Sequence, residues 1–267
     1  MHGRTVLITG ATDGLGRALA ADLAGRGADV LVHGRDLARA GAVADEIGAA
    51  GVYLADLASL AEVRRLGEAV AADHDALHVL VSNAGVGTTL PGGGERMVSA
   101  DGYELRFAVN HLAGFLLTRL LEHRLIAGAP ARIVNVASAG QWPIDFEDVM
   151  LEHGYSGMRA YAQSKLAQVM TTFDLAERLR DDRVTANALH PATFMPTKIV
   201  FDARGSSQDS LEEGVAATAR LVADADLAGV TGRYFNRTSE ARADEQAYDT
   251  GARRRLWELS ERLTGLS

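Results

Sequence analysis

The chain has 267 residues, of which 47% are hydrophobic and 23% are charged, the composition of a globular protein long enough to bury a core. It has no cysteine, which excludes disulfides and thiolate chemistry, and its net charge of −8 argues against nucleic acid or an anionic membrane as partner. No apolar run approaches the roughly 18 residues of a membrane span, and the N-terminus enters a strand directly without a signal-peptide pattern, so we expect a soluble, cytoplasmic protein.

Short apolar runs alternate with segments of helical periodicity along the whole chain. Strands are predicted over residues 5–9, 28–33, 52–55, 79–81, 132–136, 184–189 and 232–235. Helices are predicted over 15–26, 36–47, 59–72, 101–121, 211–223 and 253–263, and a further helix carries Tyr161. Because this alternation is typical of parallel βαβ units, we predict an α/β fold with a doubly wound parallel β-sheet and helices on both faces. One domain is predicted over 1–267.

A glycine-rich turn follows the first predicted strand. It reads Thr9-Gly10-Ala11-Thr12-Asp13-Gly14-Leu15-Gly16, with the spacing G-x-x-x-G-x-G. Glycines let the backbone turn tightly and approach a ligand, and the helix N-terminus beyond them offers unpaired N–H groups to a pyrophosphate. A glycine turn without a ligand is the alternative. We predict a dinucleotide site formed by Gly10, Thr12, Asp13, Gly14, Leu15 and Gly16.

The residues after the second strand bear on the choice between NAD and NADP. In dinucleotide folds a carboxylate about 20 residues past the glycines binds the ribose diol of NAD, whereas an arginine suits the 2′-phosphate of NADP. Asp36 has that separation but is equally natural as a helix N-cap, and Arg35 is better placed for a phosphate. We therefore predict NADP(H) as the favoured cofactor, with NAD(H) as the alternative. Asp56 and Leu57, after the third strand, are candidates to meet the adenine, with a turn or cap as the alternative.

A tyrosine and a lysine four residues apart open the helix that follows the fifth strand. Tyr161 and Lys165 share one face of that helix. An ammonium beside a phenol favours the phenolate and lowers a pKa that is ordinarily near ~10, which suits general acid–base catalysis. Ser138, at the end of the fifth strand, is placed to hydrogen-bond the same substrate oxygen. A surface pair without catalytic role is the alternative for Tyr161 and Lys165.

These segments together resemble the short-chain dehydrogenase/reductase family over nearly the whole chain. The matching motifs are Thr9-Gly10-x-x-x-Gly14-x-Gly16, Asn83-Ala84-Gly85, Asn110, Ser138, Tyr161-x-x-x-Lys165 and His190-Pro191. The resemblance implies a Rossmann fold in which Tyr161 is the catalytic acid in reduction and the base in oxidation. It implies that Lys165 lowers the pKa of Tyr161 and binds the nicotinamide ribose, that Ser138 polarises the carbonyl, and that Asn110 holds a water of the proton relay.

The resemblance also implies further cofactor contacts and a branch of the family. The contacts are those of Asn83, Ala84, Gly85, Pro191, Thr193 and Thr197. Thr197 lies one residue further from Pro191 than is usual in the family, so Thr193 is its rival for the nicotinamide carboxamide. The interval from Ser138 to Tyr161 is longer than is usual in the family. Its run Gln141-Trp142-Pro143-Ile144-Asp145-Phe146 and the later Tyr155, with Asn110-His111-Leu112 earlier in the chain, resemble the retinol-dehydrogenase-like branch. We expect this chain to lack the membrane anchors common in that branch, so the resemblance does not imply a retinoid substrate.

Aromatic and apolar side chains flank the catalytic residues in loops that are expected at the carboxyl ends of strands, where doubly wound sheets bind ligands. With Ser138, we predict an apolar substrate pocket formed by Trp142, Phe146, Tyr155, Phe194 and Met195, and loop packing is the alternative. A loop over about 192–210 is predicted to cover the substrate.

The sequence therefore predicts an NADP-dependent oxidoreductase that acts on a small to medium apolar ketone, aldehyde or alcohol, with Tyr161 as proton donor or acceptor. A non-redox enzyme that performs an elimination or cyclisation, and a cofactor-bound regulatory protein, are the alternatives. We expect a small-molecule substrate and no metal, nucleic acid or membrane partner. The family resemblance implies a homodimer or homotetramer.

Overall fold

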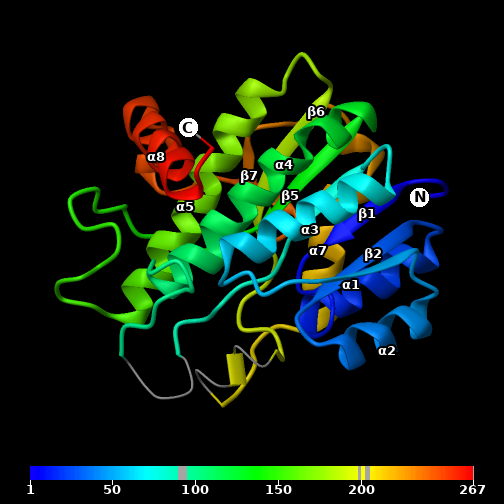
Figure 1. Cartoon of the computed structure of the whole chain (residues 1–267), viewed down its shortest axis with the longest axis horizontal. Helices are drawn as coiled ribbons and strands as arrows, with labels where there is room; N and C mark the ends of the chain where they lie inside the picture. The colour runs from blue at the N-terminus through cyan, green and yellow to red at the C-terminus, as the bar shows by residue number, and fades with distance from the viewer. Residues whose placement is uncertain (90–94, 198–199, 202–204, 267) are drawn as a thin grey trace.

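The computed structural model describes residues 1–89, 95–197, 200–201 and 205–266, which form an eight-stranded sheet flanked by helices (Figure 1). The strands are β1 (Thr5–Ile8), β2 (Asp29–Gly34), β3 (Gly51–Leu54), β4 (Val79–Ser82), β5 (Ala131–Val136), β6 (Val184–His190), β7 (Arg233–Asn236) and β8 (Ser239–Ala241). The α-helices are α1 (Gly14–Gly25), α2 (Leu37–Ile47), α3 (Leu60–Asp73), α4 (Ala113–Ala127), α5 (Gly157–Arg178), α7 (Leu211–Ala223) and α8 (Thr250–Thr264). Shorter helical segments are η1 (Phe107–Leu112), η2 (Ala225–Leu227) and η3 (Glu245–Tyr248).

The strand order is β3-β2-β1-β4-β5-β6-β7-β8, and every neighbouring pair is parallel except β7 and β8. The order reverses between β1 and β4, which is where doubly wound sheets leave a crevice at the carboxyl ends of their strands. The predicted α/β fold is confirmed.

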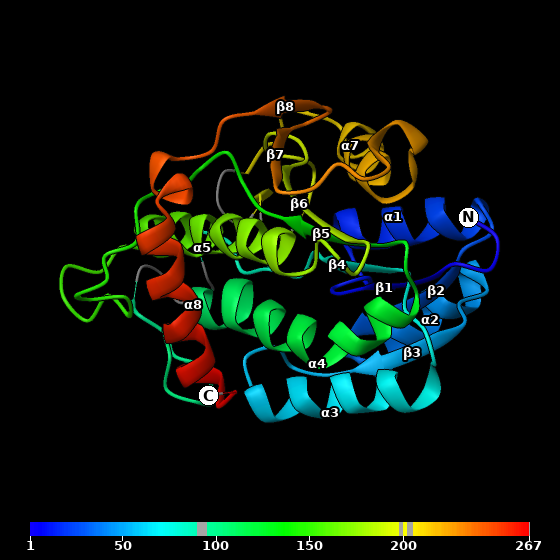
Figure 2. The same ribbon diagram turned by 90° about the horizontal axis from the view of Figure 1, so that it is seen from above.

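Both faces of the sheet are buried, because successive side chains of a strand point to opposite sides. In β1, Leu7 packs into the core under α3, α4 and α5, whereas Val6 and Ile8 pack into the core under α1 and α7. Figure 2 shows α3, α4 and α5 on one side of the sheet and α1 and α7 on the other. The strands therefore read as nearly continuous apolar runs.

The C-terminal helix α8 crosses the layer formed by α4 and α5 (Figure 2). The Trp257 ring lies 5.0 Å from that of Phe115 on α4, and the guanidinium of Arg178 on α5 lies 3.9 Å from the centre of the Trp257 ring. None of the described helices is long and apolar enough to cross a membrane.

The predicted elements are found with two main differences. The helix predicted over 101–121 begins later, at residue 105, because the Ser99 hydroxyl accepts from the N–H groups of Asp101 and Tyr103 and holds a turn there. It passes through the π-helical segment η1 and continues in α4 to Ala127. The short antiparallel strand β8 was not predicted, since its three residues carry no apolar alternation.

Candidate active site

The predicted catalytic residues come from three elements that meet at the carboxyl end of β5. Ser138 follows β5, Tyr161 and Lys165 lie in the first turns of α5, and Asn110 lies in η1. Ser138, Lys165 and Asn110 are buried, with 8%, 4% and 1% of their surface exposed, while Tyr161 is partly exposed. The structure thus brings together groups that are far apart in the sequence.

Ser138 is held by four neighbours. Its side chain hydrogen-bonds Tyr161, and its Oγ accepts from the N–H of Gly140 at 3.1 Å. Its carbonyl accepts from the hydroxyl of Tyr234 at 3.0 Å and from Nε2 of Gln141 at 2.9 Å. Burial raises the pKa of Tyr161 above its ordinary value, and the Ser138 hydrogen bond opposes this by lowering the pKa. The two hydroxyls are therefore placed to act on one substrate oxygen.

The ammonium of Lys165 donates hydrogen bonds to two acceptors other than Tyr161. Nζ donates to the carbonyl of Val136 at 2.9 Å and to Oε1 of Gln168 at 2.8 Å, and lies 5.8 Å from the centre of the Tyr161 ring. The expected lowering of the Tyr161 pKa by Lys165 is consequently not found in this arrangement, where burial dominates. Burial also lowers the pKa of Lys165 to about 7. Since an ammonium has three N–H donors, one remains for a ribose hydroxyl.

Asn110 ties the loop after β4 to α5. Its Oδ1 accepts from the N–H of Val86 at 2.7 Å, and its Nδ2 donates to the Val86 carbonyl at 3.1 Å and to Oγ of Ser164 at 2.9 Å. Both amide hydrogens are thus engaged within the protein. A Cβ on Gly85 would lie 3.2 Å from Oδ1 of Asn110 and 3.5 Å from Nζ of Lys165, so the backbone of the Asn83-Ala84-Gly85 segment runs directly beside the catalytic residues.

The glycine loop has the shape that a dinucleotide requires. Gly10 and Gly14 have φ of +65° and +48°, and a Cβ on Gly16 would lie 2.2 Å from the Gly10 carbonyl oxygen. Asn83 supports the turn by donating from Nδ2 to the carbonyls of Thr9 and Gly10 at 2.9 and 3.2 Å. These contacts leave no room for side chains at Gly10 and Gly16.

Unpaired donors at the start of α1 point to the same ligand. The N–H groups of Leu15 and Gly16 have no acceptor in the described part of the chain, as expected of a first helical turn that binds an anion. Asp13 caps this helix through the N–H of Gly14 at 2.8 Å. The residues present therefore fit the pyrophosphate of a dinucleotide.

A buried histidine lies under the glycine loop. His33 Nδ1 accepts from the N–H of Gly10 at 3.1 Å, so its Nε2 carries the hydrogen that faces the carbonyl of Ala55 at 3.2 Å. Burial lowers the pKa of His33 to about 4, which keeps the ring neutral.

Two arginines, Arg35 and Arg39, flank the end of β2. Only Arg35 was predicted from the sequence. Arg35 is exposed and lies 3.8 Å from Asp56, and Arg39 pairs with Asp13 at 3.0 Å. The carboxylate of Asp36 accepts from the N–H of Arg39 at 2.9 Å and so caps α2. Arg39 lies four residues after Arg35 in the sequence, and this spacing was the signal that would have identified it.

The two candidates for the adenine, Asp56 and Leu57, lie just after β3. Asp56 accepts from the N–H of Ala58 at 3.0 Å, which is a turn contact, and the side chain of Leu57 is buried in the core.

The two rival threonines after β6 have different surroundings. Thr193 donates its N–H to Asp209 at 2.6 Å, and its hydroxyl lies 3.1 Å from Nε2 of His190. Thr197 lies against the glycine loop, since a Cβ on Gly14 would be 3.0 Å from its Cγ2. This favours Thr197 for a cofactor contact. Of the loop predicted over 192–210, residues 198–199 and 202–204 lie outside the described residues.

Three of the predicted substrate residues have other contacts. The ring of Phe146 lies 4.8 Å from the guanidinium of Arg255, and the Tyr155 hydroxyl donates to the buried Glu104 at 3.1 Å. Met195 is partly buried and packs against the core between α1 and α7. These contacts do not support the prediction that Phe146, Tyr155 and Met195 line a pocket. Trp142 and Phe194 are 52% and 38% exposed, which leaves them as candidates.

Three polar residues at the site were not identified from the sequence, namely Gln141, Gln168 and Tyr234. Burial raises the pKa of Tyr234 to about 12, so it stays a hydrogen-bond donor to Ser138. Gln168 has a signal in the sequence, its spacing of three from Lys165 on one helix. Tyr234 has none, because β7 reaches the site only through the sheet. Gln141 lies three residues after Ser138, but its contact with the Ser138 carbonyl depends on the conformation of that loop.

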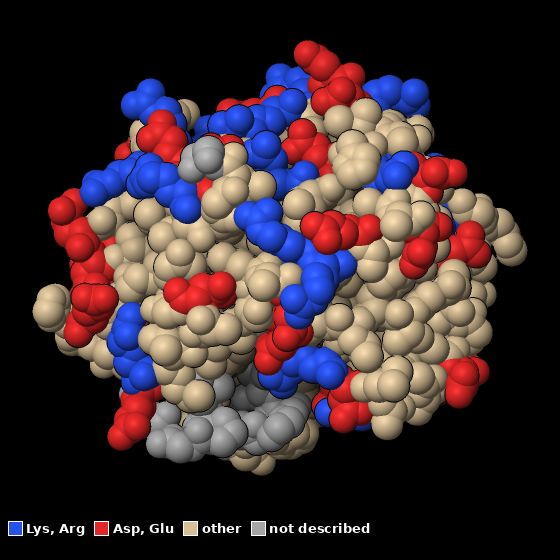
Figure 3. All heavy atoms as spheres, viewed as in Figure 1, with Lys and Arg blue, Asp and Glu red and all other residues tan. Residues whose placement is uncertain are grey.

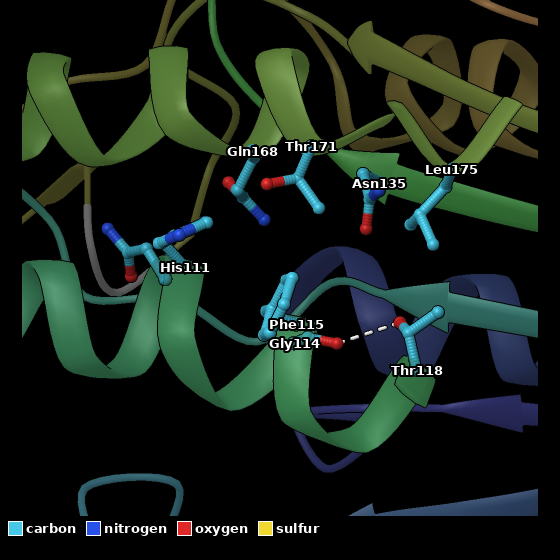
Figure 4. A pocket seen from close by; sticks show the side chains of 9 residues that line it. His111, Gly114, Phe115, Thr118, Asn135, Gln168, Thr171 and Leu175 are labelled. Atoms are coloured by element: carbon cyan, nitrogen blue, oxygen red, sulfur yellow. Dashed lines mark hydrogen bonds between the residues drawn. The ribbon is translucent and has the colours of Figure 1, made fainter. Parts of the chain in front are cut away.

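A small cavity of about 10 Å³ lies between α4 and α5 (Figure 4). Asn135 and Gln168 face it, as does Thr171, whose Oγ1 is buried without a partner in the described structure. About 10–15 Å³ is the space that one water needs, so this cavity is too small for a substrate. The described residues contain no cluster of three or more side chains suited to a metal ion.

Comparisons with known proteins agree with this geometry. The sequence model of the short chain dehydrogenase family matches residues 4–206. The chain is 38% identical to mouse retinol dehydrogenase 14, covering 100% of this chain and 87% of that protein, and 35% identical to human retinol dehydrogenase 13, covering 99% and 85%.

Solved structures are similar as well. An uncharacterized protein from Mycobacterium paratuberculosis has a TM-score of 0.79 at 31% identity, covering 99% of this chain and 94% of the other. Pseudomonas aeruginosa RhlG, in an NADP active-site complex, has a TM-score of 0.73 at 26% identity, covering 88% and 95%.

Proposed function

This chain belongs to the short-chain dehydrogenase/reductase family and is an NAD(P)-dependent oxidoreductase of CH–OH and C=O groups. We propose that it uses NADP(H) to interconvert small to medium apolar alcohols and carbonyl compounds. The observation that carries the proposal is the meeting of Ser138 and Tyr161 beside Lys165, next to a loop shaped for a dinucleotide.

In the direction of reduction, the Tyr161 hydroxyl transfers its proton to the carbonyl oxygen while the Ser138 hydroxyl donates a hydrogen bond to the same oxygen. The nicotinamide, when bound, supplies the hydride to the carbonyl carbon. Lys165 keeps an N–H donor for the nicotinamide ribose. In oxidation Tyr161 accepts the proton of the alcohol.

Arg35 and Arg39 support NADP over NAD. Arg39 pairs with Asp13 of the glycine loop, and Arg35 directly follows β2 and lies near Asp56. A 2′-phosphate would be bound at this end of β2, where an arginine suits it. Asp36, the residue that would favour NAD, is engaged as the cap of α2. The NADP complex of RhlG is consistent with this preference.

The substrate class rests on Trp142 and Phe194, two exposed apolar side chains in the loops at the carboxyl ends of the strands. The similar proteins are named retinol dehydrogenases, so retinol should be included in a substrate screen with short ketones, aldehydes and secondary alcohols. We expect a homodimer or homotetramer, which light scattering would measure.

The test is a fluorescence titration with NADPH and separately with NADH, followed by the substrate screen with the preferred cofactor. We expect tighter binding of NADPH and turnover that consumes it. Preference for NADH would refute the cofactor assignment. Steady turnover without net consumption of cofactor would identify the non-redox alternative, and binding without turnover across the screen would favour the regulatory one.

A further inference from the structure

A cleft of about 570 Å³ opens at the amino-terminal edge of the sheet, opposite the active site. Its walls are the starts of β1, β4, β5 and β6, the turn between α5 and β6, and the segment from the end of α7 through η2. In Figure 1 the turn between α5 and β6 lies at the top, while the loops that follow β4 and β6 lie at the bottom. This volume is within the range of about 300–1,000 Å³ that is typical of small-molecule pockets.

The charge of this cleft is opposite to that of the chain. The protein carries a net charge of −8, but the cleft is lined by four arginines and one histidine, and none of its described lining residues is acidic. These basic residues are Arg4, Arg132, Arg180, Arg183 and His78. On the face shown in Figure 3, by contrast, acidic and basic side chains are intermingled. A concave surface with charges of one sign attracts ligands of the opposite sign.

Two of the guanidinium groups are held in place by backbone carbonyls. Arg132 donates to the carbonyls of Leu221 and Asp224 at 2.9 and 2.8 Å, and Arg4 donates to that of Pro130 at 2.9 Å. Neither has a carboxylate oxygen within 4.0 Å in the described part of the chain. Burial is the largest cause of the lowered pKa of Arg132 and of His78, and charge repulsion from Arg4 adds to it in both cases. The carboxylates of Asp224 and Asp226 oppose this lowering at Arg132, and that of Asp29 opposes it at His78. Three cationic or basic groups therefore lie close together without an anionic partner at contact distance.

Arg183 reaches the cleft from a strained backbone. Its φ is +60°, in the left-handed region that residues other than glycine rarely adopt. Its N–H donates to the carbonyl of Arg180 at 3.4 Å, and its carbonyl accepts from the N–H of Ala131 at 3.2 Å. The turn that holds this conformation places Arg180 and Arg183 at the same opening.

The remaining lining is mostly apolar. It includes Val79, Pro130, Val184, Val222, Ala223 and Ala225. A small hydrated anion such as phosphate would leave this surface in contact with water, whereas an amphiphilic anion would cover it. Guanidinium groups match the planar geometry of a carboxylate. We propose that this cleft is a second binding site, distinct from the active site, for an organic carboxylate with an apolar body.

The test is isothermal titration calorimetry with decanoate on the full chain, comparing wild type with the double variant R180A/R183G. Glycine adopts φ of +60° freely, so R183G removes a guanidinium and relieves strain, and Arg180 is exposed. R254A is the matched control, because Arg254 is 78% exposed on α8 and contacts only Glu258 at 3.9 Å among the described residues. An unchanged titration with NADPH establishes that each variant is folded.

We expect wild type and R254A to bind one decanoate per chain, and R180A/R183G to bind at least tenfold more weakly. Decanol, which lacks the carboxylate, is expected not to compete. Absence of decanoate binding to wild type would overturn the proposal. So would equal binding to R180A/R183G, which would place decanoate elsewhere, including the active site. Inorganic phosphate that displaces decanoate at equal concentration would show that the apolar lining is not used, and would overturn the assigned ligand class.

Discussion

The ammonium nitrogen of Lys165 lies 2.8 Å from Oε1 of Gln168, three residues further along α5. This contact stabilises the protonated amine with a neutral acceptor, while burial lowers the pKa of Lys165 to about 7. The amine therefore titrates in the pH range in which the enzyme would work, and Gln168 affects both its direction and its protonation.

Replacing Gln168 by leucine removes this acceptor, so the pKa of Lys165 should fall further. Because activity needs the ammonium form, we expect the alkaline limb of the kcat profile to move to lower pH by about one unit. Gln168→Glu is the matched control, since a carboxylate should move the limb in the opposite direction. If both variants kept the kcat pH profile of wild type, the proposed effect of Gln168 on the protonation of Lys165 would be contradicted.

Tyr161→Phe removes the proton donor but keeps the ring. Turnover should fall by about 10²–10⁴-fold, the usual contribution of a general acid, while NADPH binding stays within about twofold of wild type. Stopped-flow measurement of hydride transfer and a fluorescence titration check the two parts. Retention of most of the activity would show that Tyr161 is not the acid.

Loss of both arginines beside the glycine loop should change cofactor preference. For Arg35→Ala combined with Arg39→Ala, we expect NADPH affinity to fall by about tenfold or more, since two charge-assisted contacts to the 2′-phosphate would be lost. NADH affinity, which does not depend on that phosphate, serves as the internal control. An equal loss for both cofactors would mean that the variant has damaged the loop instead.

Two glycines of α1 provide a matched pair. Gly16→Ala would place a Cβ 2.2 Å from the Gly10 carbonyl oxygen, so we expect loss of dinucleotide binding and destabilisation by about 1–3 kcal/mol. In Gly25→Ala the added Cβ would have no atom within 4 Å, so this variant should be neutral or stabilised by up to about 1 kcal/mol. Urea denaturation and NADPH titration of both variants measure this difference. If the two variants had similar stability and similar NADPH affinity, the close approach of Gly16 to the Gly10 carbonyl would be refuted.

Acid should destabilise the fold through His33. Its folded-state pKa of about 4 lies below the ordinary value of 6.5, so the unfolded chain binds more protons between these values. The stability due to neutral His33 is thus fully present above pH 6.5 and is lost as the pH falls towards 4, by about 2 kcal/mol at pH 4.5.

The comparison variant for this effect is His33→Gln. Between pH 7 and pH 4.5, the free energy of unfolding of this variant, measured in urea, should decrease less than that of wild type. The buried His111, with a pKa lowered to about 3 by burial, contributes to the acid sensitivity of both proteins and cancels in the comparison. An identical fall in wild type and variant would contradict the prediction.

Much of the architecture could be predicted because it depends on local patterns. The alternation of strands and helices, the glycine spacing after β1 and the i, i+4 pair of Tyr161 and Lys165 are each set by a few adjacent residues. Parallel βαβ connections then bring the carboxyl ends of β1, β4 and β5 to one edge. The sequence by itself therefore determined the fold class and brought the predicted catalytic residues to one edge of the sheet.

Only the tertiary structure decided which of several chemically similar residues face the site. Thr197 lies against Gly14, while Thr193 is held by Asp209. Met195 packs against the core, although its neighbour Phe194 is exposed. Lys165 points to Gln168, so its effect on Tyr161 differs from the expectation based on spacing alone. These outcomes depend on side-chain rotamers and on contacts between segments far apart in the chain, and no local pattern encodes either.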